Sequence, residues 1–106
     1  METDDVLSAL RAFVAEREWA QFHSPENLAK SISIESAELL ECYQWNSEPA
    51  STEVRDELAD VLTYCFLLAD RLDFDPGEII LSKLTQTQEK YPVELARGRS
   101  EKHDRL

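Results

Sequence analysis

Hydrophobic residues recur every three or four positions along most of this chain, which is the spacing of one face of an α-helix. No stretch alternates between hydrophobic and polar residues as the strands of a hairpin do. The pattern predicts four helices, over about residues 4–20, 25–44, 52–72 and 76–91. We therefore expect an all-α fold of the four-helix bundle type.

Proline and small polar residues mark where these helices begin. Ser24 and Pro25 predict an N-cap followed by a proline at the first helical position. Ser51 or Thr52 is the expected cap of the third helix. Residues 75–78 read Asp-Pro-Gly-Glu, which predicts a capping box at the start of the fourth helix.

The third helix is apolar on nearly every side between Leu58 and Leu72. Such a helix must be covered all round, and three neighbouring helices of one small chain cannot do this. We therefore expect a homodimer or a dimer of dimers, with this helix near the centre. The length of 106 residues fits a single domain over 1–106, in which about residues 93–106 form a polar, partly ordered C-terminal tail.

Charge narrows the range of partners. Twenty-two acidic residues against eleven basic ones give a formal net charge of −11. This balance argues against a nucleic acid polymer and against an anionic membrane, because both attract positive charge. The longest apolar run, residues 61–69, is about half as long as a membrane span. Two cysteines and no cationic leader favour a cytoplasmic protein with reduced thiols.

Four acidic residues stand where apolar residues are expected. Glu35 lies inside the apolar stripe of the second helix, and Glu38 lies one turn further on at its border. On the third helix, Glu57 and Asp60 share a face with Tyr64. A solvated helix face can explain one such pair. Two pairs near one core are costly, because buried carboxylates lose hydration and repel one another.

A divalent cation is the simplest compensation for these four acids. Carboxylate oxygens without histidine or cysteine favour Mg²⁺, with Mn²⁺ also possible. Mg²⁺ keeps coordination positions that phosphate oxygens can fill, so a phosphorylated substrate is expected. With no Gly-rich phosphate loop and no Ser/His/Asp set in the sequence, activation of water is the chemistry that the residues allow.

Several other side chains are candidate substrate contacts. Lys83, Thr87 and Lys90 share a face of the fourth helix, and the two lysines either meet phosphate oxygens or are ordinary surface residues. Trp19, Trp45 and Tyr64 either stack on a base or belong to the core. His23 is either a contact to the substrate or a residue of the loop before the second helix.

The spacing Glu35-x-x-Glu38, eighteen residues, then Glu57-x-x-Asp60 resembles the signature of the all-α nucleoside triphosphate pyrophosphatases, the MazG-like superfamily. The surrounding residues are similar to its dCTP pyrophosphatase-like branch, over roughly residues 4–99. They include Glu16-Arg17-Glu18-Trp19, Gln21-Phe22-His23, Gln44-Trp45, Tyr64, Lys83 and Tyr91-Pro92.

This resemblance implies a Mg²⁺-dependent hydrolase that converts a (deoxy)nucleoside triphosphate and water into the monophosphate and pyrophosphate. The four acids hold the metal, and Glu35 or Glu38 helps to activate the water that attacks the α-phosphorus. The implied substrate is dCTP-like or a modified nucleotide that is cleared from the pool. By resemblance, the base pocket takes Trp19, Trp45 and Tyr64, the phosphates meet Lys83 and Tyr91, and sites are built from two chains of a homodimer or homotetramer.

Two positions depart from that branch. Thr87 stands where an asparagine is frequent, and Leu10 stands where the typical member has a histidine near the base. Two alternatives therefore stay open. One is a non-catalytic helical homodimer that acts as a nucleotide-binding, metal-binding or regulatory module. The other is a different substrate of the same superfamily, such as dUTP or phosphoribosyl-ATP.

Overall fold

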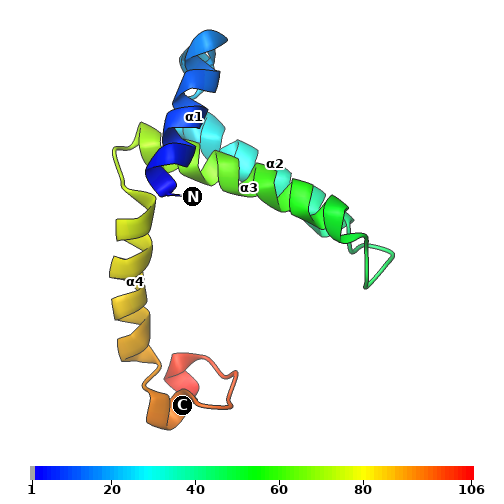
Figure 1. Cartoon of the computed structure of the whole chain (residues 1–106). Helices are drawn as coiled ribbons and strands as arrows, with labels where there is room; N and C mark the ends of the chain where they lie inside the picture. The colour runs from blue at the N-terminus through cyan, green and yellow to red at the C-terminus, as the bar shows by residue number, and fades with distance from the viewer. Residues whose placement is uncertain (1) are drawn as a thin grey trace. The chain divides into compact units, whose positions relative to one another are not determined.

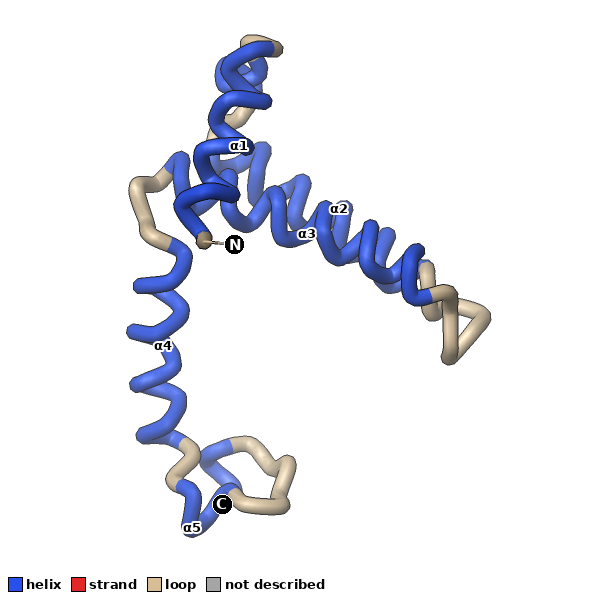
Figure 2. Tube along the Cα trace, viewed as in Figure 1, coloured by secondary structure: helices blue, strands red, loops and turns tan. Residues whose placement is uncertain are grey.

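The computed structural model describes residues 2–106, and every regular element in that range is helical (Figures 1 and 2). This confirms the all-α prediction. The elements are α1 (Thr3–Glu16), η1 (Trp19–Phe22), α2 (Pro25–Glu41), α3 (Ser51–Arg71), α4 (Pro76–Lys90), α5 (Val93–Ala96) and η2 (His103–Arg105). No helix in the described residues is long and apolar enough to cross a membrane. The chain divides into two compact units, and the boundary in the sequence lies between Asp75 and Pro76. The single domain over 1–106 stays a prediction.

The first unit is built on a helical hairpin. In Figure 1, α2 and α3 lie side by side and antiparallel, joined by the loop 42–50 at one end. Near the other end α1 packs on α3, and the core residues Leu7, Leu28 and Ala69 are buried there. The Arg11 guanidinium binds the Asp70 carboxylate through Nε, at 3.1 Å from each oxygen, and through Nη2. The hairpin therefore fixes α2 against α3, and this ion pair ties α1 to α3.

The start of α2 is formed as predicted. Ser24 is the N-cap, and its Oγ accepts a hydrogen bond from the Asn27 backbone N–H at 3.2 Å, while Pro25 is the first helical residue. The helix ends at Glu41, three residues earlier than expected. The reason is a tightened last turn, in which the Cys42 and Tyr43 N–H groups bind carbonyls three residues back.

Two predicted helix ends are wrong. The first helix stops at Glu16 instead of Ala20, because Glu18 adopts a left-handed conformation with φ of 53° and η1 follows. Nor does Ser51 or Thr52 cap the third helix: Ala50 occupies the cap position, and no side chain there accepts a hydrogen bond. The early turn after α1 brings the Trp19 ring edge-on to Phe13, with ring centroids 5.5 Å apart.

The second unit contains α4, α5 and η2. The helix α4 starts at Pro76, as the proline predicts. The segment expected to be a polar tail forms the short helix α5 and a 3₁₀ turn, and His103 in that turn contacts the Tyr91 ring edge-on at 5.8 Å. This end of the chain is more ordered than its composition suggests.

Candidate functional site

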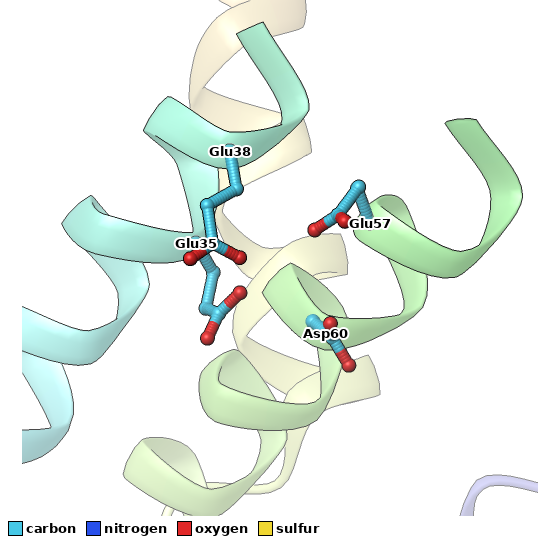
Figure 3. Close-up of side chains that lie close together, drawn as sticks. All are labelled: Glu35, Glu38, Glu57 and Asp60. Atoms are coloured by element: carbon cyan, nitrogen blue, oxygen red, sulfur yellow. The ribbon is translucent and has the colours of Figure 1, made fainter. Parts of the chain in front are cut away.

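The four predicted acids converge on the α2–α3 hairpin. Figure 3 shows Glu35 and Glu38 on α2 facing Glu57 and Asp60 on α3. One carboxylate oxygen from each residue lies within 4.8 Å of those of the other three. Residues three positions apart share a helix face, so two antiparallel helices can present both pairs to one point.

This cluster carries negative charge without visible compensation. Glu35 and Glu57 are half-buried, and the Oε2 atom of each is buried without a hydrogen-bond partner. Among the described residues, no lysine or arginine forms an ion pair with any of the four acids. A positive group bound between the two helices would give these buried oxygens a partner.

The same crowding shifts two protonation equilibria. The pKa of Glu35 is raised by a hydrogen bond shared with Glu38, then by burial, and then by the neighbouring negative charges. The pKa of Glu57 is raised first by burial and then by the charges of Glu38 and Asp60. Both carboxylates therefore hold a proton more readily than an exposed glutamate does.

The residues fit a divalent cation. Four carboxylates offer hard oxygen ligands, and the two buried, unpartnered oxygens would gain a partner when a cation binds. Within the part of the chain that the structure describes, the cluster contains no histidine or cysteine, which disfavours a zinc site. The four residues could therefore hold a divalent cation of the kind that prefers oxygen ligands.

A cavity of about 210 Å³ adjoins the acids, because Asp60 lines it as well. It lies between α1 and α3 and contains three of the predicted substrate contacts, Trp19, His23 and Tyr64. The other lining residues are Leu10, Phe13, Val14, Thr63 and Leu67. A neighbouring cavity of about 230 Å³ shares Val14, His23 and Leu67 but contains none of the four acids. Of these two cavities, the one of about 210 Å³ is therefore the one that connects aromatic side chains with the acid cluster.

The other predicted contacts are not brought to this cavity. Trp45 lies in the loop 42–50 with 90% of its surface exposed. Lys83, Thr87 and Tyr91 belong to the second unit. There, the Thr87 hydroxyl donates to the Lys83 carbonyl at 3.1 Å, and both residues line an open groove on α4. Their roles stay predictions.

The sequence did not single out several residues that line the cavity. They include Phe13 and Val14 on α1 and Thr63 on α3. One signal for Thr63 was available. It lies three residues after Asp60, so it shares that face of the helix.

Comparison with known proteins places the chain in a family. A family model described as the MazG-like family matches residues 30–106, a stretch that contains all four acids. This chain belongs to the MazG-like family. The resemblance inferred from the acid spacing is thereby confirmed.

Individual relatives agree with this placement. The MazG-like chain is 36% identical to dCTP pyrophosphatase 1 from Mus musculus and from Homo sapiens, over 97% of its own length. It spans 66% of those relatives, just under two thirds of their length. It is also similar to the crystal structure of a pyrophosphatase from Archaeoglobus fulgidus, with a TM-score of 0.76 and 40% identity. That match covers 84% of this chain and 91% of the other.

Proposed function

We propose that this chain is a Mg²⁺-dependent nucleoside triphosphate pyrophosphohydrolase. The observation that carries the proposal is the four-carboxylate cluster that shares Asp60 with an aromatic cavity. The relatives named dCTP pyrophosphatase 1 and the structural neighbour named as a pyrophosphatase support the reaction class. The products are a (deoxy)nucleoside monophosphate and pyrophosphate.

The four acids act at the triphosphate end of the substrate, and the cavity residues act at the base. When bound to the four acids, Mg²⁺ supplies positive charge to the phosphate oxygens and makes water a better nucleophile. Glu35 or Glu38 accepts the proton of the attacking water, because both carboxylates lie in the cluster beside the place where that water would be held. The water oxygen bonds to the α-phosphorus as the bond to the bridging oxygen breaks, and pyrophosphate leaves.

The cavity holds the base. Trp19 and Tyr64 present aromatic surfaces to it, and His23 offers a polar edge. Its volume of about 210 Å³ can hold a nucleobase, and the relatives named dCTP pyrophosphatase 1 favour a cytosine-type base. A dCTP-like or modified pyrimidine nucleotide, cleared from the cytoplasmic pool, is the substrate that we propose.

We further propose that a second copy of the chain completes the site. Hydrophobic side chains are exposed along α3 and α4, among them Leu58, Leu62, Ile80 and Leu81. Covering them in a homodimer or homotetramer removes apolar surface from water. Lys83, Thr87 and Tyr91 would meet the phosphates and Trp45 the base in that assembly. The family match spans both compact units, which supports treating residues 1–106 as one functional domain.

The test is pyrophosphate release from a panel of deoxynucleoside and ribonucleoside triphosphates. Each is incubated with the protein in Mg²⁺, in Mn²⁺ and in EDTA, and the nucleotide product is identified. Release that requires the metal and yields a monophosphate supports the proposal, and the panel ranks the bases. A folded, metal-binding protein that releases no pyrophosphate from any nucleotide contradicts it and favours the non-catalytic binding module.

A further inference from the structure

Thr63 is a polar residue in an otherwise apolar part of the base cavity. It lies on α3 one turn after Asp60 and is half-buried. Lining residues of that cavity on α1 and further along α3 are hydrocarbon or aromatic: Leu10, Phe13, Val14 and Leu67. A hydroxyl among such side chains can influence which ligand edge is accepted, because a bound ligand covers it and an unmatched polar group then loses its contact with water.

The proton of this hydroxyl is already used. Thr63 Oγ1 donates to the carbonyl oxygen of Ala59, one turn earlier in α3, at 2.8 Å. A hydroxyl has one proton and two lone pairs, so what remains is a hydrogen-bond acceptor. The helix thereby gives Thr63 a fixed polarity that a freely rotating hydroxyl lacks.

Pyrimidine bases differ in the group on C4 that could pair with this acceptor. Cytosine carries an amino group on C4, which donates hydrogen bonds, while thymine and uracil carry a carbonyl oxygen, which only accepts. An acceptor on the protein pairs with the amino group and leaves the carbonyl unpaired. Asp60 is the other acceptor that lines the cavity, but the proposed function assigns it to the metal cluster. The remaining polar side chains do not impose this choice, since the Trp19 ring only donates, and His23 and Tyr64 can do either.

We propose that Thr63 is a specificity-determining residue that selects the amino-bearing pyrimidine, cytosine, over uracil and thymine. The proposal rests on the proposed function, because it assigns the base to this cavity. It adds the physical reason for a cytosine preference in a chain that has Leu10 at its cavity wall instead of a polar residue.

The test is the ratio of kcat/KM for dCTP to that for dUTP in three variants. Thr63→Val keeps the branched shape but removes the acceptor, and we expect the ratio to fall roughly tenfold. Thr63→Ser keeps the acceptor and should keep the ratio. Thr85→Val is the matched control, because the Thr85 hydroxyl makes the same kind of bond to Leu81 O, at 3.2 Å, on the exposed surface of α4.

Nucleotide binding measured by calorimetry with Ca²⁺ in place of Mg²⁺ separates this inference from the proposed function. Equal losses for dCTP and dUTP in Thr63→Val, or a parent protein that hydrolyses both equally, overturn the role of Thr63 and leave the enzyme intact. A parent that binds dCTP in preference to dUTP through Thr63 but hydrolyses neither supports the inference and contradicts the proposed function.

Discussion

At the scale of single residues, the acid cluster has a cost that binding of a cation removes. Glu35 and Glu57 each keep one buried oxygen without a partner, and four carboxylates meet within 4.8 Å. Ionised carboxylates in such a place lose hydration and repel one another. Activity and stability therefore respond in opposite directions when one of these charges is removed.

Glu35→Gln and Asp60→Asn test this opposition. Each should lower kcat for pyrophosphate release by about 100-fold or more, because a ligand and a proton acceptor are lost. In metal-free buffer each should leave the melting temperature unchanged or raise it, because repulsion falls. Glu41→Gln is the control, since Glu41 is an exposed residue of α2 outside the cluster. A clear loss of metal-free stability in the two variants would mean that these acids have structural partners.

The same residues set a pH dependence. The pKa values of Glu35 and Glu57 are raised in the folded protein above the ordinary 4.5, so folding takes up protons in this range. In metal-free buffer the free energy of unfolding should therefore be highest near or below pH 4.5, as far as these groups contribute, and fall as the pH rises through their folded pKa values. Urea denaturation between pH 4 and 8 measures it. Saturating Mg²⁺ should remove the fall, and an unchanged slope with Mg²⁺ would contradict the site.

At the scale of elements, the position of the acids depends on how α2 begins. The Ser24 cap fixes the first turn of the helix that carries Glu35 and Glu38. Ser24→Ala should lower the free energy of unfolding by about 1 kcal/mol, the usual loss for an N-cap. Ser24→Asn restores a capping side chain and should recover the stability. Chemical denaturation of both variants checks this, and an unchanged free energy of unfolding in Ser24→Ala would show that the Ser24 bond adds nothing.

The two tryptophans should separate binding from stability. Trp45 is 90% exposed in the α2–α3 loop, so Trp45→Ala should weaken nucleotide binding and leave the melting temperature nearly unchanged. Trp19 packs edge-on against Phe13 and lines the base cavity, so Trp19→Ala should weaken binding and also cost about 1 kcal/mol of stability. Calorimetric titration and thermal melts measure both quantities. Unchanged nucleotide binding in Trp45→Ala would exclude its stacking role.

The sequence predicted these elements unevenly, for physical reasons. Prolines gave the starts of α2 and α4, because a proline fits the first helical position and few other places in a helix. The three-residue spacing of the acids predicted two charged faces, and antiparallel packing brought them together. The end of α1 was missed, because the left-handed Glu18 is neither glycine nor asparagine. Thr63 was missed, because its role comes from the cavity around it and from no local pattern.

At the scale of the whole molecule, the main feature is the large number of hydrophobic side chains that a single chain leaves exposed to water. The sequence predicted the all-helical fold and the family, and both are confirmed. The oligomer stays a prediction. It follows from exposed side chains such as Ile80 and Leu81 on α4, which a lone chain leaves in water.

Sedimentation equilibrium should give a mass two or four times the 12.2 kDa of one chain. Ile80→Lys should shift the population toward the monomer, because a charge on a covered apolar face loses its hydration. Ser82→Lys, on the opposite and exposed side of the same helix, is the control and should leave the mass unchanged. A mass of one chain at every concentration would contradict the proposed assembly.

The Arg11–Asp70 ion pair has a consequence for how mutations affect function. It joins α1 to α3, and these two helices supply most of the residues that line the cavity of about 210 Å³, although neither charged residue lines it. Arg11 lowers the pKa of Asp70, chiefly through their hydrogen bond, so this joint stays ionised at neutral pH. Substitutions at Arg11 or Asp70 should therefore loosen α1 from α3 and weaken binding of the proposed substrate in the cavity between them. In a mutational survey, residues that make no contact with a nucleotide would also determine how well this cavity binds it.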